Sequence, residues 1–324
     1  MKKSHLLTAS VFIGLLPSLG VLAEEQEKRT KLRSWAHTID EWMGEPDPEQ
    51  PATAGLRIML DSQWNHYDHF SIKPRVRGKI RLPTLKKQLS LVFGDEDLDN
   101  ESRDKNHIGK VYNQPLNKNK HYDRRQTRED NASVGLRWSD SIKKLGIDTD
   151  IDLGIRSGSD IYLRFRVGKE WFITERFSTR LEQIYRYGSN SKHYLRTNFE
   201  NKYRTSDNTF IANQLYLQSE HDVDEKNSWG NSFYRQHDFN NYKRLNYGIF
   251  IGGDIENKKF HINQYGPFIT WRQPILRQWF FIQPELNYYN DKKQGRSHHV
   301  GAFLRLEACL LYTSPSPRDR TRSR

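Results

Sequence analysis

Five basic side chains occupy every second position of one short stretch of the chain. Lys73, Arg75, Arg77, Lys79 and Arg81 alternate with residues that are mostly apolar. Successive side chains of a β-strand point to opposite faces, so this spacing predicts a strand with one cationic and one apolar face. Guanidinium and ammonium groups bind carboxylates and phosphates, and arginine can do so through two parallel hydrogen bonds. The chemistry indicated by this row is therefore the binding of anions.

A second row has the opposite charge. Asp148, Asp150 and Asp152 alternate with apolar or β-branched residues in the same way. Other predicted strands add basic residues to the polar face, so that cations outnumber anions there; these are Arg137, Arg164, Arg166, Arg180 and Arg196. If the strands enclose one interior, two interpretations stay open. The cations select anions in a water-filled passage, or they pair with the acidic row and fill the interior.

Few residues of the sequence resemble catalytic or metal-binding motifs. The sequence has no HExxH, GxSxG, CxxC or phosphate-binding glycine-rich loop. His69 and Ser71 share one face, as a Ser/His hydrolase could require, but a histidine beside a strand end explains them better. The carboxylates between Asp95 and Glu101 could hold Ca²⁺, although they lack EF-hand spacing. We therefore predict no catalytic residues, no metal site and no cofactor.

The elements that must position these rows are strands. Segments with period-two alternation recur along the chain at 56–60, 70–82, 89–93, 132–138, 147–155, 161–167, 177–187, 195–203, 211–217, 229–238, 245–251, 260–272, 278–289 and 300–306. We predict about 14 strands, or 12 if the weaker segments are loops. The polar stretch 95–131 predicts one long loop. Pro74, Pro267 and Pro284 fall inside predicted strands, where we expect bulges or positions near the rims.

The two ends of the chain differ from this pattern. Residues 1–23 have two lysines, a short apolar stretch and small residues before Glu24, which predicts a cleaved export signal. Residues 24–54 predict a periplasmic segment with a short helix, a possible plug, and the barrel is expected at 55–310. Residues 310–324 resemble translated sequencing-adapter read-through, so 311–324 are interpreted as a non-native tail. The only cysteine, Cys309, lies at that junction.

Two features favour a membrane barrel over a soluble sheet. Aromatic residues lie towards strand ends, as in the interfacial girdles of such barrels; they include Tyr187, Tyr203, Tyr247, Trp271 and Tyr288. The stretch His299-Val-Gly-Ala-Phe-Leu-Arg-Leu306 resembles the last-strand assembly signal of outer-membrane barrels. The chain thus resembles the bacterial outer-membrane β-barrel (porin-like) superfamily over residues 55–310. This resemblance implies an all-β, antiparallel up-and-down barrel in contact with outer-membrane lipid and lipopolysaccharide.

The composition and charge of the chain limit the classes of function that it can have. The chain is 35% hydrophobic with a net charge of +12, and its mean hydropathy is −0.91. The basic residues alternate along strands and form no nucleic-acid-binding motif, so nucleic acid is not an expected partner. We predict a passive channel for small anionic solutes with a cationic lumen. Two alternatives remain: an outer-membrane hydrolase acting on lipid or surface polymer, and a non-conducting barrel whose extracellular loop binds a partner. The sequence indicates no particular oligomeric state.

Overall fold

The structure is a computed structural model of the whole chain, and it describes residues 53–81, 89–96, 122–142, 145–221, 225–240 and 242–313. The predicted export signal lies outside the described residues, as do residues 24–52 of the predicted periplasmic segment and residues 314–324 of the predicted tail. Residues 53–54 and 311–313, which the sequence assigns to that segment and that tail, belong to strands of the sheet.

Almost all of the described chain is β-strand. The first eight strands are β1 (Thr53–Asn65), β2 (His69–Arg81), β3 (Leu89–Gly94), β4 (Ser133–Ile142), β5 (Ile147–Arg156), β6 (Asp160–Phe172), β7 (Phe177–Gly188) and β8 (Lys192–Ser206). They are followed by β9 (Thr209–His221), β10 (Glu225–Asp238), β11 (Arg244–Glu256), β12 (Lys259–Phe260), β13 (Gln264–Ile275), β14 (Arg277–Asp291) and β15 (Arg296–Thr313). One short helix, α4 (Arg124–Asn131), precedes β4.

The strands close into an antiparallel barrel. Each pairs with its neighbours in the chain, β1 pairs with β15, and a β10–β11 pairing completes the ring. Fourteen strands build this wall, because the two-residue β12 pairs only with β11 as a small hairpin outside the ring. The predicted number and antiparallel architecture are therefore confirmed. The predicted segment 260–272 divides between this hairpin and β13.

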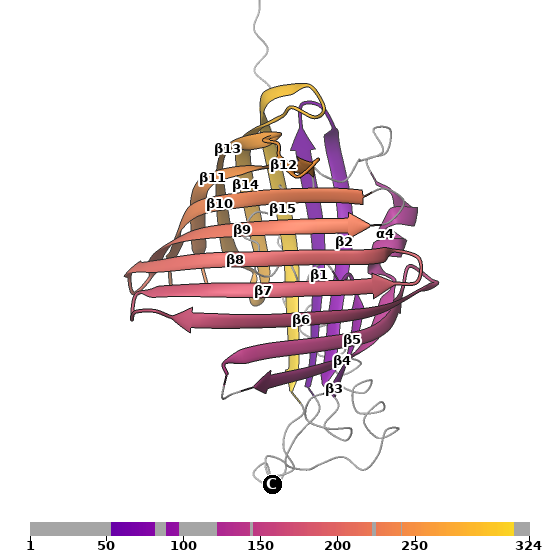
Figure 1. Cartoon of the computed structure of the whole chain (residues 1–324). Helices are drawn as coiled ribbons and strands as arrows, with labels where there is room; N and C mark the ends of the chain where they lie inside the picture. The colour runs from indigo at the N-terminus through magenta and orange to yellow at the C-terminus, as the bar shows by residue number, and fades with distance from the viewer. Residues whose placement is uncertain are drawn as a thin grey trace, which may run out of the picture.

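The barrel has two distinct ends. The connections β1–β2, β3–β4, β5–β6, β7–β8, β9–β10, β11–β13 and β14–β15 lie at one end, called here the loop end. Both described termini lie at the other, called the turn end, where Thr53 pairs with Thr313. In Figure 1, β6–β10 run across the front of the barrel, and β1, β2 and β15 run behind them in a different direction. Side chains from strands far apart in the sequence consequently meet inside.

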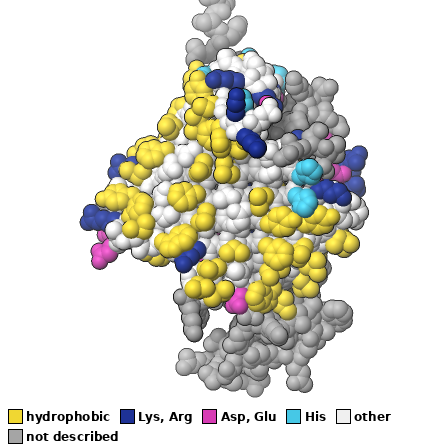
Figure 2. All heavy atoms as spheres, in the orientation of Figure 1, with side chains coloured by type: hydrophobic (Ala, Val, Ile, Leu, Met, Phe, Trp, Pro, Cys, Tyr) yellow, Lys and Arg dark blue, Asp and Glu magenta, His cyan; other side chains and the backbone are white. Residues whose placement is uncertain are grey.

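The outer and inner faces follow the predicted alternation. Outward positions carry exposed apolar side chains, including Val134, Leu136, Leu153, Ile155, Ile161, Leu163, Phe165, Val167, Ile249, Leu286 and Val300. Figure 2 shows such side chains spread over the front wall, with basic side chains mostly towards its margins. The aromatic residues Tyr187, Tyr203, Tyr247 and Tyr288 are also exposed, near strand ends. Among the described residues, no helix is long and apolar enough to span a membrane.

Helix α4 lies within the stretch predicted to be an unstructured loop. Its N-terminus is capped by the Asp123 side chain, which accepts hydrogen bonds from the backbone N–H groups of Arg125 and Gln126 at 3.0 and 3.1 Å. None of its residues is buried, so no apolar periodicity marked it in the sequence. The capping aspartate was the available signal.

The end of the helix binds the edge of β2 that the short strand β3 leaves unpaired. Strand β3 has 6 residues against 13 in β2, and its last pairing is Gly94 with Arg77. Beyond that point, Asn131 at the end of α4 accepts from the Val76 N–H at 2.7 Å and donates to the Pro74 carbonyl at 2.9 Å. The missing N–H of Pro74 therefore faces the side where β3 has ended, and the proline is tolerated in mid-strand.

The other two prolines also lie where pairing is interrupted. The β13–β14 ladder skips from Thr270–Glu285 to Gln273–Ile282, and Pro284 lies in that gap. Pro267 follows Gly266, whose φ of 153° is open to glycine, and it precedes the first β13–β14 pair. Each of these two prolines thus lies beside an interruption in one of the two ladders that flank its strand.

Candidate functional site: the charged interior of the barrel

The interior has two chemically different sides. Strands β1–β8 and β15 contribute most of its arginines and carboxylates, and this side is called the charged side. Strands β9–β14 contribute mainly aromatic rings, amides and hydroxyl groups, and this side is called the neutral side. All thirteen residues predicted to line the interior lie on the charged side, on strands β2, β4, β5, β6, β7 and β8.

The acidic row of β5 pairs with the strands on either side of it. Asp152 accepts from Arg137 of β4 through both carboxylate oxygens, at 2.7 Å each, and Arg164 of β6 reaches it at 3.4 Å. Asp150 binds Arg166 of β6 at 3.0 Å, while Asp148 is exposed. The closest partners shown for this row therefore come from the neighbouring strands, while Lys79 of the basic strand β2 also interacts electrostatically with Asp150.

The basic residues of β2 have several different partners. Arg75 binds Asp95 at 2.6 Å and lies 3.6 Å from Asp61. Lys73 binds Asp130 of α4 at 2.7 Å, and Arg77 contacts the Gly94 carbonyl at 3.4 Å. Near the turn end of the strand, Lys79 and Arg81 are exposed. The row is therefore buried in the middle of the barrel and exposed towards one mouth.

The remaining predicted arginines are held by mixed partners. Arg166 also binds Glu182 at 2.8 Å, and Arg180 lies 3.8 Å from both Glu170 and Glu182. Arg196 has only 1% of its surface exposed and donates to Asn198 and Gln218 at 2.9 and 2.8 Å. Its guanidinium group also lies 4.4 Å from the centre of the Tyr216 ring. Neutral partners hold this cation where the two sides of the interior meet.

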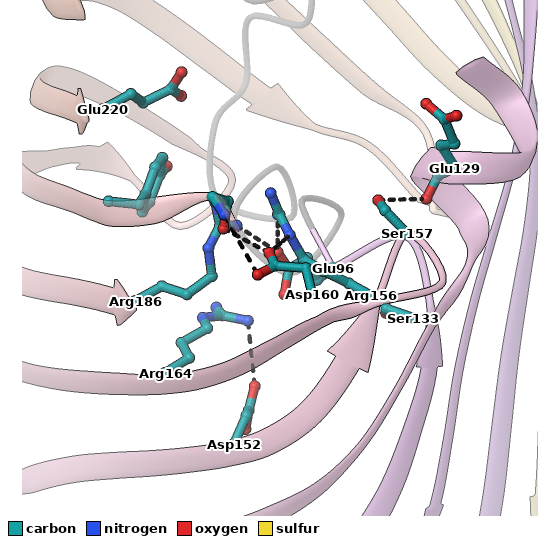
Figure 3. Close-up of polar contacts among 12 residues, drawn as sticks. Glu96, Glu129, Ser133, Asp152, Arg156, Ser157, Asp160, Arg164, Arg186 and Glu220 are labelled. Atoms are coloured by element: carbon teal, nitrogen blue, oxygen red, sulfur yellow. Dashed lines mark hydrogen bonds and ion pairs between the residues drawn. The ribbon is translucent and has the colours of Figure 1, made fainter. Parts of the chain in front are cut away.

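A compact group of charges lies near the loop end and is called the Glu96 cluster (Figure 3). Glu96 follows the end of β3, and its Oε1 accepts from Arg156 of β5 at 2.6 Å and from Arg186 of β7. Arg156 also donates to Asp160 at 3.0 Å. The Arg186 guanidinium group lies 4.8 Å from the centre of the Tyr194 ring. Three segments of the barrel thus converge on one carboxylate.

Two more ion pairs lie at the loop end, on the opposite part of the rim. Arg296 donates to both oxygens of Asp68, at 2.6 and 2.7 Å. Lys293, in the turn between β14 and β15, donates to Asp254 at 2.6 Å. That hydrogen bond raises the pKa of Lys293 above the usual lysine value. The β1–β2 and β14–β15 connections are therefore tied together by charge.

The neutral side has a packed aromatic cluster inside the barrel. Its buried members are Ala212, Tyr234, Phe250, Phe268, Tyr289 and Phe303. Polar atoms of three neighbouring residues are buried beside it and make no hydrogen bond within the described part of the chain: Asn246 Oδ1, Thr270 Oγ1 and both amide atoms of Asn287. Amides and hydroxyls here are therefore poorly satisfied, unlike the paired charges opposite.

Several residues of the charged side were missed in the sequence. Asp61 binds Arg305 through two contacts of 2.6 Å, and Glu96 was interpreted as part of a solvated loop. A usable signal existed for Glu96, because Ser90, Val92 and Glu96 share one parity and all are buried. Extending the alternation of the predicted strand by three residues would have placed this carboxylate inside.

The alternative motifs do not come together as sites. His69 is exposed at the start of β2 with φ of 57°, while Ser71 is buried further along the same strand. Asp95 and Glu96 are each held by arginine, and residues 97–101 lie outside the described chain. Among the described residues, no group of three or more His, Cys, Asp or Glu side chains is arranged as metal ligands.

Among known proteins, the chain is similar to solved structures. No family model matches the chain, and no curated protein matches its sequence. A loop-deletion mutant of OmpT, an outer membrane protein of Vibrio cholerae, is 9% identical with a TM-score of 0.49 over 80% of this chain and 99% of that one. A mutant Rh. blastica porin is 10% identical, with a TM-score of 0.44 over 80% and 99% of the two chains. The NanC porin is 6% identical, with a TM-score of 0.38 over 78% and 100%.

Proposed function

We propose that the protein is a porin-like channel of the bacterial outer membrane that passes small anionic solutes. A closed barrel with an apolar outer face and a polar interior suits a lipid bilayer, because it leaves no unpaired strand edge in the hydrocarbon. The longest connection, between β3 and β4, lies at the opposite end, which supports a periplasmic position for the end with both termini. The exposed apolar outward positions then meet lipid, and the aromatic residues near strand ends meet the interfaces.

The basic residues at the turn-end mouth carry the anion part of the proposal. Arg57 of β1 and Arg272 of β13 share the carboxylate of Glu307, at 2.7 and 3.0 Å. Lys79 and Arg81, on the neighbouring β2, are exposed. Positive charge at the mouth of a low-dielectric wall raises the local concentration of anions and repels cations.

Planar-bilayer recording with the purified barrel tests this function. We expect open steps whose reversal potential in a salt gradient shows anion preference. The double charge reversal Lys79→Glu/Arg81→Glu should move that potential towards cation preference. Arg235→Glu is the matched control, because Arg235 is exposed on an outward position of β10. A barrel that stays silent, or reversals that act equally on both sides of the wall, would contradict the proposal.

A second candidate, a non-conducting barrel, is favoured by the buried ion pairs. Arg137 and Asp152 have only 7% and 2% of their side-chain surface exposed, and Arg305 and Asp61 only 3% and 8%. Paired charges of this kind can fill an interior as a structural layer. Silence in the same recordings, together with a well-folded barrel, is the outcome that this candidate requires.

A further inference from the structure

We propose that Arg156 and Arg186 form a binding site for a carboxylate, and that the chain's own Glu96 occupies this site in the structure. The inference deepens the proposed function and rests on it for its biological role, because it narrows the anionic solutes to carboxylates. Glu96 acts here as a built-in stand-in for a ligand.

The position of the two arginines is set by the barrel wall. Arg156 is the last residue of β5 and is anchored through its Nε to Asp160. Arg186 lies on β7, with its guanidinium group over the ring of Tyr194 on the adjacent β8. Both groups therefore keep their positions through contacts other than Glu96. A site held in this way is preorganised for an anion, which reduces the entropic cost of binding.

The contact made by Glu96 is incomplete for a carboxylate between two guanidinium groups. Both arginines bind the single oxygen Oε1. The second oxygen, Oε2, is buried and has no hydrogen-bond partner among the described residues, and the same holds for Nε of Arg186. Arginine and carboxylate pair best through two parallel hydrogen bonds. A free carboxylate that turns both oxygens towards Arg186 could satisfy donors that Glu96 leaves unused.

Two deeply buried carboxylates on the charged side lack this feature. Asp152 receives Arg137 through both oxygens, and Asp61 receives Arg305 in the same way. Glu96 also belongs to no strand, since β3 ends at Gly94 with a left-handed φ of 87°. Its carboxylate is therefore less constrained by the sheet than those of Asp152 and Asp61, which are strand residues. This combination singles out the Glu96 cluster as the replaceable pair.

Chemical rescue tests the inference without any need for conduction. The full-length barrel is folded in detergent, and thermal unfolding of Glu96→Ala is followed in sodium propionate and in sodium chloride of equal ionic strength. Propionate carries the carboxylate and the one methylene group that the alanine variant lacks, with one additional methyl group. We expect it to raise the melting temperature of Glu96→Ala by several degrees more than chloride does, with little difference for the unaltered chain.

Two variants make the rescue specific. Glu96→Ala/Arg186→Met removes one guanidinium group and should lose the propionate effect. Asp68→Ala leaves Arg296 without the carboxylate that binds it through both oxygens, and it should show a much weaker rescue because only one arginine forms that pair. Equal rescue of Asp68→Ala and Glu96→Ala would overturn the proposal, since it would reflect general pairing of arginine with propionate.

A binding measurement covers the case in which Glu96→Ala does not fold in either salt. The near-isosteric Glu96→Gln removes the charge and keeps the volume, so the amide should be displaced more easily than the carboxylate. Calorimetry should then show propionate binding at least tenfold tighter for Glu96→Gln than for the unaltered chain. Absence of binding to Glu96→Gln would overturn the site, whereas a silent barrel that still binds propionate would contradict only the channel function.

Discussion

The two sides of the interior differ in the kind of polar group that they bury and in how most of these groups are paired. On the charged side, buried arginines and carboxylates are joined by short contacts, as in Arg137 with Asp152 at 2.7 Å. On the neutral side, Thr270 and Asn287 have buried polar atoms without hydrogen-bond partners in the described chain. Removing one member of a buried ion pair leaves an uncompensated charge, whereas removing an unsatisfied hydroxyl removes a cost. The two sides should therefore respond to polar-to-neutral substitutions with opposite sign.

The largest expected effect is that of Asp152→Asn. The change keeps the volume but leaves Arg137 and Arg164 facing a neutral amide in a position that is 1% exposed. We expect a loss of about 3–5 kcal/mol in the free energy of unfolding, measured by denaturant titration of the folded barrel in lipid vesicles. Asp254→Asn makes the same change beside the exposed Lys293 and should cost less than about 1 kcal/mol. Equal costs for the two variants would show that burial does not set the strength of the charged side.

The strand pattern was predictable because one face of each strand is exposed and apolar. Ile161, Leu163 and Phe165 show period two without interruption, and they all lie outward. Alternation assigns a side chain to a face, but it carries no information on which strands face one another across the interior of the barrel. The hydrogen bond from Arg186 to Glu96, 90 residues apart in sequence, depends on that arrangement and could not be derived from spacing.

The aromatic interior of the neutral side was not predicted, because parts of its strands carry apolar residues on both faces. On β11, Phe250 is buried inside while its neighbours Ile249 and Ile251 lie on the outward parity. The outward residues of this run keep period two, so the sequence indicates a strand without indicating an aromatic interior. Helix α4 was not predicted for a different reason. A fully polar helix has no apolar periodicity, and only Asp123 marked its start.

A smaller effect is expected at the edge of the charged side, where β3 ends early. Asn131→Ala removes the hydrogen bonds that the side chain makes to the Val76 N–H and the Pro74 carbonyl, together with a third to the Thr127 carbonyl within α4. We expect a loss of about 3 kcal/mol, the sum of three typical intramolecular hydrogen bonds, by the same denaturant titration. Asn131→Asp keeps the acceptor for Val76 but loses the donor to Pro74, so it should fall between the alanine variant and the unaltered chain. If both variants match the unaltered chain, the edge of β2 is satisfied in another way.

The smallest effect, and the one of opposite sign, is expected for Thr270→Val on the neutral side. Valine has the shape of threonine, and the lost Oγ1 is buried without a hydrogen-bond partner among the described residues. The variant should gain about 1 kcal/mol in stability, because the desolvation cost of the hydroxyl disappears. Thr197→Val is the matched control, since Thr197 Oγ1 donates to Gln183 at 2.8 Å and its removal should destabilise the barrel. A loss of stability in both variants would mean that water or solute satisfies the Thr270 hydroxyl in the folded barrel. The neutral side would then be a polar surface that contacts water or solute, as we propose for the charged side.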